Sequence, residues 1–237
     1  MALKFHSEGN LIEASKYYQI VLDKGVLHPQ IFSNYGVLLR ILGEIDKAKN
    51  LFKKSIKLFP EDPNSYINLA NIYRDHGNFK DAEYNERLAI ELNPNDEIAY
   101  SNLSNTLSNI GKIDEAEFFA RKAIEINPSY EGAYNNLATI LRDVGRTKEA
   151  EISINESIKL KPNYAKSYSQ LAGILIDLGR IKEAEIALIK SLKIDPNNSQ
   201  AIFIYSTFKK SKEEDFYKKI LFSNNILENK SKKECID

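Results

Sequence analysis

The chain has 237 residues, and its 33 basic and 33 acidic side chains give a formal net charge of zero. This balance argues against a nucleic-acid partner, because such binding depends on cationic contacts with phosphates. Its one cysteine, Cys235, can form no intrachain disulfide and supplies too few ligands for a zinc site. No apolar run approaches the roughly 20 residues that cross a bilayer, and the N-terminus lacks the apolar stretch of a signal peptide, so we expect a cytoplasmic protein with no membrane partner.

The sequence repeats itself every 34 residues. Such a period indicates stacked structural units and has to be recognised before any element is assigned. Proline, glycine, alanine and a large aromatic residue each recur at this spacing. The positions are Pro60, Pro94, Pro128, Pro162 and Pro196; Gly9, Gly43, Gly77, Gly111, Gly145 and Gly179; Ala14, Ala48, Ala82, Ala116, Ala150 and Ala184; and Phe32, Tyr66, Tyr100, Tyr134 and Tyr168.

The first 28 residues begin inside this pattern and form a partial unit, 1–28. Gly9 and Ala14 fit their columns, which predicts a short first helix over residues 1–8 and a second helix from Leu11 to Lys24. The N-terminal edge of this unit is open and offers a surface for self-association with another copy. The apolar side chains expected at that edge are Leu3, Phe5 and Leu11.

Five full units follow, and each is predicted to be a pair of helices. They cover residues 29–62, 63–96, 97–130, 131–164 and 165–198. In the central unit, Tyr100, Leu103 and Leu107 are spaced three and four residues apart, which places them on one face of a helix. Gly111 ends this helix, because glycine adopts the left-handed conformation at low cost. A second helix is expected from about Ile113 to Ile126.

The second helix of the central unit faces the first through small residues, Ala116, Ala120 and Ala123, which allow the two helices to approach closely. Pro128 cannot continue this helix and marks its end. A polar residue follows most of these prolines and is expected to cap the next helix. These candidate caps are Asn95, Ser129, Asn163 and Asn197.

The pattern degrades after residue 198. Residues 199–222 are predicted to hold a first helix from Ser199 to Lys209 and an amphipathic closing helix from Lys212 to Phe222, but the glycine and alanine columns fail there. Residues 223–237 form a polar, lysine-rich tail that we expect to be solvated.

The columns resemble those of the tetratricopeptide repeat (TPR), whose order of aromatic, leucine, glycine, alanine and proline residues is kept across residues 29–198, with Tyr or Phe in place of the usual tryptophan. The resemblance implies an all-α fold, an α-solenoid in which stacked helical hairpins wind into a right-handed superhelix. It also implies that the first helix of each pair lines the concave face.

A column of amides lies on one face of the first helices, rotated away from the apolar residues. Its members are Asn34, Asn68, Asn102, Asn136 and Gln170, and Asn71 and Asn105 add a second, partial column. Each amide offers a donor and an acceptor to a peptide backbone. The pattern resembles the asparagine ladder of TPR arrays attached to protein O-GlcNAc transferases, which implies binding of an extended polypeptide. The alternative is that the amides bond to one another or to neighbouring backbone and only link repeats.

Charged residues flank the amides. Arg40, Arg74 and Arg142 recur at one place in the repeat, and Asp75, Asp143 and Asp177 recur one residue beyond it. One interpretation is a wall of mixed charge that orients a ligand. The other is a solvated surface with local Arg–Asp pairs, which contribute little to stability.

No pattern of catalytic residues is found in the sequence. His6, His28 and His76 lie in separate repeats without metal-ligand spacing, and neither a phosphate-binding glycine loop nor a nucleophile elbow occurs. We therefore expect no catalytic residue, no metal and no cofactor, and a protein that is not an enzyme.

The leading hypothesis is a protein–protein interaction scaffold that binds an extended peptide or a partner protein along the concave face. The alternative is the substrate-recruiting TPR region of a larger glycosyl- or sulfotransferase whose catalytic domain lies outside this chain. The segment from Phe203 to Lys233 is similar to the one that joins TPR arrays to sulfotransferase-type domains in some bacterial proteins. Binding of RNA is disfavoured by the neutral charge and by the scarcity of aromatic side chains for base stacking.

Overall fold

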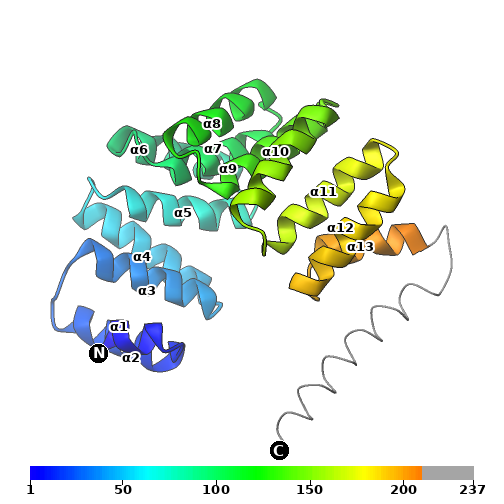
Figure 1. The fold of residues 1–237 in the computed structure, drawn as a ribbon. Coiled ribbons are helices and arrows are strands. Elements are labelled where there is room, and N and C mark those ends of the chain that lie inside the picture. Colours follow the sequence, from blue (N-terminus) through cyan, green and yellow to red (C-terminus); the bar gives the residue numbers. More distant parts are fainter. Residues whose placement is uncertain (210–237) are drawn as a thin grey trace, which may run out of the picture. The chain divides into compact units, whose positions relative to one another are not determined.

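Every element in residues 1–209, the part of the chain that the computed structural model describes, is an α-helix (Figure 1). The chain divides into two units, Met1–Asn136 and Leu137–Asp237, and each is described by itself. The prediction of an all-α fold is confirmed, and the helices stack pairwise as the hairpins of an α-solenoid. The closing helix predicted from Lys212 to Phe222 and the tail 223–237 lie outside the described residues.

The helices of the first unit are α1 (Ala2–Ser7), α2 (Leu11–Asp23), α3 (Pro29–Ile41), α4 (Ile45–Leu58), α5 (Pro63–Asp75), α6 (Phe79–Leu92), α7 (Glu97–Asn109) and α8 (Ile113–Ile126). Helix α9 (Glu131–Asp143) crosses the boundary. The second unit continues with α10 (Thr147–Leu160), α11 (Ala165–Asp177), α12 (Ile181–Ile194) and α13 (Ser199–Lys209).

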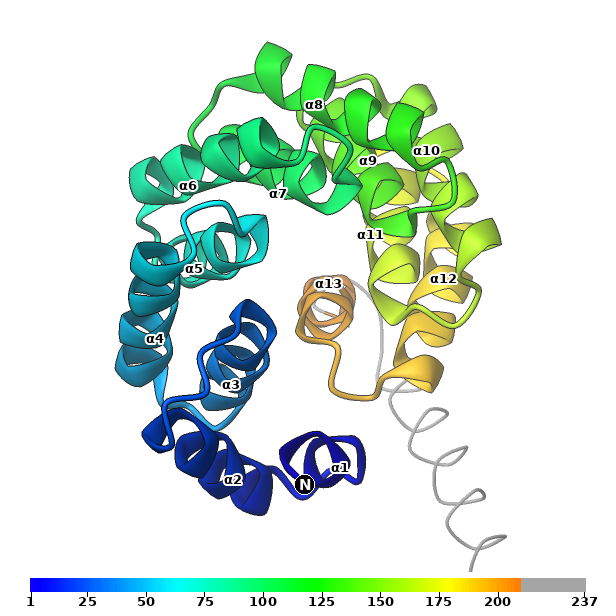
Figure 2. The same cartoon turned by 90° about the vertical axis from the view of Figure 1, so that its left-hand side faces the viewer.

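Two layers of helices make up the first unit (Figure 2). The first helices of the pairs, α3, α5 and α7, form one layer, and the second helices α4, α6 and α8 form the other. Helices α4 and α6 each pack against the first helix before and the first helix after them, α8 packs on α7, and α5 also contacts both α3 and α7. Every hairpin therefore buries its apolar side against its neighbours, which is what makes a solenoid stable.

Small and apolar columns of the repeat fill the core of the first unit. Leu103 and Leu107 of α7 are completely buried, and so are Ala116, Ala120 and Ala123 of α8. The second helix of this central pair begins and ends at the predicted residues. The close approach expected of the alanine columns is thus present.

Glycine ends the first helices as predicted. Gly111 has a φ of +79°, and its N–H donates to the carbonyl of Ser108 at 3.1 Å while the N–H of Lys112 donates to that of Leu107 at 2.9 Å. This pair of bonds satisfies carbonyls that the end of a helix leaves without partners. The chain can then reverse within two residues and begin the second helix.

The predicted N-caps are wrong by one residue. Helices α7, α9, α11 and α13 begin at Glu97, Glu131, Ala165 and Ser199, so Asn95, Ser129, Asn163 and Asn197 lie one residue too early. In α7 the cap is Asp96, whose Oδ1 accepts hydrogen bonds from the N–H groups of Ile98 and Ala99. Asn95 instead belongs to a turn around the proline, in which its N–H donates to Oδ1 of Asn93 at 3.3 Å.

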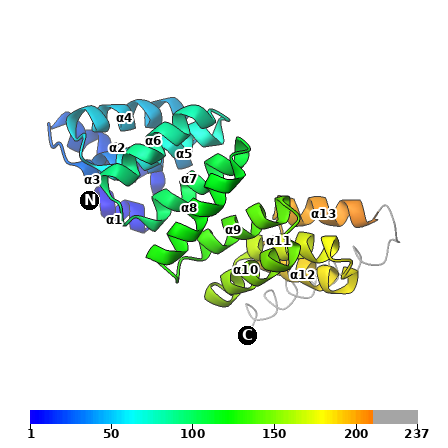
Figure 3. The same ribbon diagram turned by 90° about the horizontal axis from the view of Figure 1, so that it is seen from above.

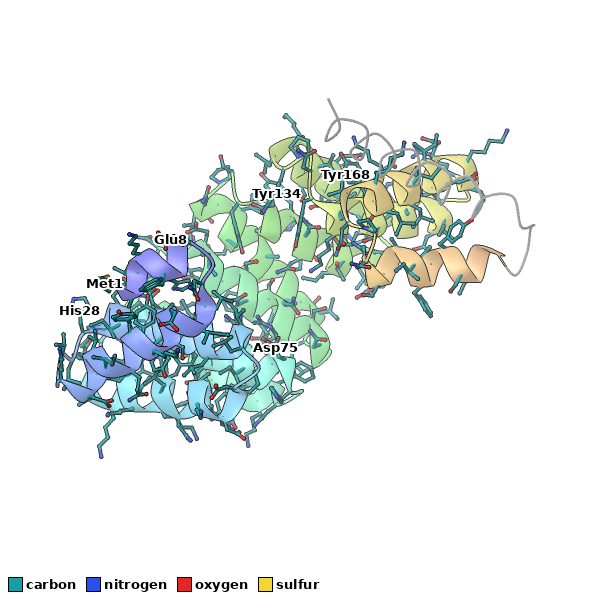
Figure 4. The ribbon with its side chains drawn as sticks, turned by 90° about the horizontal axis from the view of Figure 1, so that it is seen from below. Met1, Glu8, His28, Asp75, Tyr134 and Tyr168 are labelled. Carbon is teal, nitrogen blue, oxygen red and sulfur yellow. The ribbon has the colours of Figure 1, made fainter. Side chains whose placement is uncertain are left out.

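The N-terminal helices also follow the prediction, but their apolar edge is smaller than expected. Phe5 stacks on Tyr17 with ring centroids 5.2 Å apart, and Phe5 and Leu11 both pack against the core. Leu3 remains 63% exposed. In Figure 4, Met1 and Glu8 mark the two ends of α1. Of the three residues expected at this edge, Leu3 is therefore the one that stays mostly exposed, and self-association through it remains a prediction.

The described part of the second unit ends with three helices that lie next to one another, α11, α12 and α13 (Figure 3). Ala201 and Tyr205 of α13 are buried in a cluster with Ala172 and Leu175 of α11 and with Leu188 of α12. Helix α13 therefore takes the place of a first helix, as the sequence predicts.

Candidate binding face of the first helices

The ten predicted site residues all lie on the first helices of the hairpins. We call the side of α3, α5 and α7 that is turned away from α4, α6 and α8 the first-helix face of the first unit. All ten predicted residues are partly buried. Those in the first unit are Asn34, Arg40, Asn68, Asn71, Arg74, Asn102, Asn105 and Asn136, and those in the second are Arg142 and Gln170.

Asn102, Asn136 and Gln170 link one repeat to the previous one. The Nδ2 of Asn136 donates to the backbone carbonyl and to Oγ of Ser101 on α7, both at 2.9 Å. The Nε2 of Gln170 donates to Oγ1 of Thr139 at 2.8 Å, and Oδ1 of Asn102 accepts from Arg74 at 3.5 Å. These bonds correspond to the linking role that the sequence leaves open as the alternative to ligand binding.

Of the remaining amides, Asn71 and Asn105 are bonded within their own helix, whereas the side chain of Asn34 also forms a hydrogen bond with Tyr18 on α2. Oδ1 of Asn34 accepts from Gln30 at 3.1 Å, and Oδ1 of Asn105 accepts from Asn109 at 2.7 Å. Asn68 makes no hydrogen bond with any described residue. The middle of the first unit, on α5 and α7, is therefore where the amides keep the most hydrogen-bonding capacity.

Two of the three arginines pair with an aspartate of the next repeat. Arg40 on α3 lies 3.6 Å from a carboxylate oxygen of Asp75. Asp75, labelled in Figure 4, is the last residue of α5. In the second unit, Arg142 donates twice to Asp177, at 2.5 and 3.2 Å. These pairs match the interpretation of local pairing, since each aspartate is more than a third exposed.

Arg74 departs from this pattern because the residue that would face it in the next repeat is Asn109, which carries no charge. Its Nη1 donates instead to Oε1 of Glu86 on α6, at 2.6 Å. Its Nη2 donates to Oδ1 of Asn71 at 2.5 Å and of Asn102 at 3.5 Å. One guanidinium therefore joins a buried carboxylate to the amides of two neighbouring first helices.

Glu86 is completely buried, and the sequence analysis missed it. Its Oε1 also accepts from Oγ1 of Thr106 at 3.0 Å, whereas Oε2 is buried without a partner. The 34-residue register contains the signal: the same column holds Phe52, Ala120, Ile154 and Leu188. The exception of one carboxylate among these apolar residues is the sequence signal that could have identified Glu86.

Burial raises the pKa of Glu86 to about 7. The positive charge of Arg74 and the hydrogen bonds from Thr106 and Arg74 oppose this rise but do not cancel it. Removing a carboxylate from water disfavours its charged form. The side chain consequently changes charge close to neutral pH.

The three histidines have local contacts. His28 caps α3 by accepting from the N–H of Gln30, Nδ1 of His76 lies 2.8 Å from the carbonyl of Ile72, and Nδ1 of His6 lies 3.3 Å from the hydroxyl of Tyr18. Within residues 1–209, no three His, Cys, Asp or Glu side chains are grouped so that they could hold a metal ion. None of the helices in that range is long and apolar enough to cross a membrane.

Models of the tetratricopeptide repeat match residues 29–62, 51–84, 87–118, 119–152 and 165–198. Together with the stacked hairpins, these matches show that the chain belongs to the tetratricopeptide repeat family. They give no support specific to the TPR arrays of O-GlcNAc transferases or of sulfotransferase proteins, so that finer resemblance stays a prediction. No curated protein matches the chain.

Solved structures share the fold. A thermophilic TPR protein of Thermus thermophilus is 24% identical with a TM-score of 0.69, over 76% of this chain and 98% of its own. YrrB, described as a TPR protein with an unusual peptide-binding site, is 17% identical with a TM-score of 0.55, over 81% and 99%. The Cut9–Hcn1 complex of the APC/C matches with a TM-score of 0.76 at 18% identity, over 84% of this chain and 40% of that one.

Proposed function

We propose that this chain is a protein-interaction scaffold, not an enzyme, and that it binds an extended polypeptide along its first helices. The supporting observation is the set of side-chain amide groups on α5 and α7 whose N–H₂ donors have no partner among the described residues. These belong to Asn68, Asn71, Asn102 and Asn105. A backbone carbonyl or an acceptor side chain of a bound peptide would fill these vacant donors.

The family and one relative agree with this function. TPR repeats typically mediate protein–protein interactions, and only repeats of this kind are detected in the chain. The similarly folded YrrB has a peptide-binding site. By analogy of fold, we extend peptide binding to this chain, with the amide face as its place.

The ten predicted site residues do not contribute equally in this proposal. Asn136 and Gln170 would have to give up bonds between repeats before they could contact a ligand. Arg40 and Arg142 would have to leave aspartate partners. Asn68, Asn71 and Asn105 can engage a peptide without breaking a bond between repeats, and they carry the proposal.

The test compares two sets of substitutions. We expect Asn68→Ala, Asn71→Ala and Asn105→Ala together to weaken binding to an array of end-blocked peptides at least about tenfold, because several hydrogen bonds are lost. Thermal stability should change little, since these side chains make no bond between repeats. Binding is measured by fluorescence anisotropy and stability by circular dichroism.

Asn136→Ala is the matched control, because it removes the two bonds to Ser101. This variant should melt at a lower temperature while peptide binding on α5 and α7 is kept. A triple variant that melts far below wild type, or that binds peptides as well as wild type, would contradict the proposed face.

The second candidate function is recruitment of substrate for a larger glycosyl- or sulfotransferase. Its support is the similarity of Phe203–Lys233 to a segment that joins TPR arrays to sulfotransferase-type domains, and most of that segment lies outside the described residues. Sequencing the native gene past the codon of Asp237 tests it. A transferase domain in the same reading frame would favour this role, and a stop codon would exclude it.

A further inference from the structure

The amides in the middle of the first-helix face have a fixed orientation. A guanidinium can only donate hydrogen bonds, so an amide beside it must present its oxygen. Nη2 of Arg74 contacts Oδ1 of Asn71 at 2.5 Å and Oδ1 of Asn102 at 3.5 Å. Both oxygens are therefore directed at Arg74, and the N–H₂ groups are left to face a ligand.

Arg74 is itself held in place by the buried carboxylate of Glu86 on α6. Its side chain is only 17% exposed, and its Nη1 donates to the completely buried Glu86 at 2.6 Å. Thr106 on α7 holds the same carboxylate oxygen at 3.0 Å. Because a buried charge that loses its partner is strongly destabilising, Arg74 is not free to swing away from this carboxylate. The orientation of the two amides thus follows from a contact in the core.

The amide oxygens of Asn71, Asn102 and Asn105 each already accept a hydrogen bond. Oδ1 of Asn105 accepts from Asn109 at 2.7 Å, and the carboxylate of Asp75 faces Arg40. The Oδ1 atoms of Asn68 and Asn109 accept no hydrogen bond from the described residues. Among the amides of Asn68, Asn71, Asn102 and Asn105, a ligand that accepts hydrogen bonds therefore finds four free N–H₂ groups, whereas a ligand that donates, such as a lysine-rich segment, finds one free oxygen.

We propose that the α5–α7 part of the first-helix face selects a peptide segment rich in acceptors, carrying aspartate or glutamate, and that Arg74 is the positioning residue behind this selectivity. The inference rests on the proposed function of peptide binding and adds the class of peptide. Carboxylates are the strongest acceptors that a peptide offers to N–H donors. A phosphate backbone also accepts hydrogen bonds, but the zero net charge and the pairing of Arg74 with Glu86 favour a peptide over a nucleic acid.

The repeat supplies a variant that removes the positioning residue and should still fold. In the unit 165–198, the places of Arg74 and Glu86 are taken by Ile176 and Leu188. The double substitution Arg74→Ile with Glu86→Leu copies that pair and leaves no unpaired charge in the core. It frees the amides of Asn71 and Asn102 to rotate and present either atom.

The experiment titrates the full chain with three end-blocked peptides of equal length, in which serine alternates with aspartate, lysine or glutamine. Wild type should bind the aspartate peptide at least about tenfold more tightly than the lysine peptide, as expected for hydrogen bonds to a charged acceptor. The double variant should lose this preference and still bind the glutamine peptide within about threefold of wild type. Resonances of the side-chain N–H₂ groups of Asn71 and Asn102 should shift when wild type binds the aspartate peptide.

Arg142→Ile is the control for charge, since it removes an arginine of the same column that contacts Asp177 and no amide. It should keep the preference for aspartate. Equal binding of all three peptides, or a preference that survives in the double variant, would overturn the inference while leaving peptide binding intact. If no peptide binds to wild type, or if single-stranded RNA binds at physiological salt instead, both the inference and the proposed function fail.

Discussion

At the scale of single residues, Glu86 is the side chain that changes the properties of its surroundings most. Four apolar residues occupy its place in other units, and a carboxylate there costs free energy unless it is well paired. Arg74 and Thr106 satisfy one oxygen and leave the other without a partner. The stability of the array should therefore depend on whether this carboxylate carries a proton.

The direction of that dependence follows from the pKa of Glu86, which burial raises from 4.5 to about 7 in the folded chain. Between these two pH values the folded state holds a proton that the unfolded state has lost. The unfolding free energy should consequently be highest below pH 4.5 and fall as the pH rises to about 7, by on the order of 3 kcal/mol from this one group. Urea denaturation at a series of pH values measures the slope, and Glu86→Gln should flatten it.

Glu83 on the same helix is the control, because its pKa moves the other way. Burial alone would raise the pKa of Glu83, but hydrogen bonds from Lys112 and Arg87 outweigh it and lower the pKa. This carboxylate stabilises the fold above its unfolded pKa, and that contribution is lost as the pH falls through its folded pKa. Glu83→Gln should thus leave the decline between pH 4.5 and 7 in place. A decline that also persists in Glu86→Gln would show that another group causes it.

At the scale of helices, the reversal between the two members of a hairpin depends on backbone conformation. Gly111 adopts a φ of +79°, and a Cβ added there would meet no atom within 4 Å. A substitution is therefore strained by its dihedral angle and not by a steric clash.

We expect Gly111→Ala to lower the unfolding free energy by roughly 1 kcal/mol, because a side chain disfavours the left-handed conformation. Gly111→Asn should cost less, since asparagine is the next most common residue at this place. Thermal denaturation of both variants checks the order. Equal losses would mean that space, and not the dihedral angle, limits residue 111.

The sequence predicts helices better than it predicts their caps and contacts. Periodicity alone places the helix from Ile113 to Ile126 and its buried alanines, because a core column must recur on one face. The observed N-caps lie one residue later than the predicted ones. The residue predicted as the cap instead donates its backbone N–H to the side chain of the residue before the proline. The contact of Arg74 with Glu86 crosses from α5 to α6 and depends on distances that no column contains.

The same limit applies to the candidate face. The register predicts that Asn68, Asn71 and Asn102 recur along the first helices. It does not predict which of their atoms are occupied, because that depends on where one guanidinium points. The recurring positions were readable from the sequence, whereas the state of each amide required coordinates.

At the scale of the whole molecule, each helical hairpin is stable only because it packs against the neighbouring hairpins. Ala116 is completely buried, and helix α8, which carries it, packs on α7. We expect Ala116→Phe to lower the unfolding free energy by roughly 1–3 kcal/mol through overpacking. Calorimetry measures this loss. Phe118→Ala on the same helix, at a side chain that is 62% exposed, should stay within about 0.5 kcal/mol of wild type, and equal effects of the two would refute the assigned core.

The two hydrogen bonds from Asn136 to Ser101 depend more on the side chain at position 136 than on the side chain at position 101. One of the two acceptors is a main-chain carbonyl, which is present whatever residue stands at position 101. Position 136, by contrast, needs a side chain that donates a hydrogen bond, because that carbonyl can only accept one. Among related sequences, we therefore expect residue 101 to vary more than residue 136.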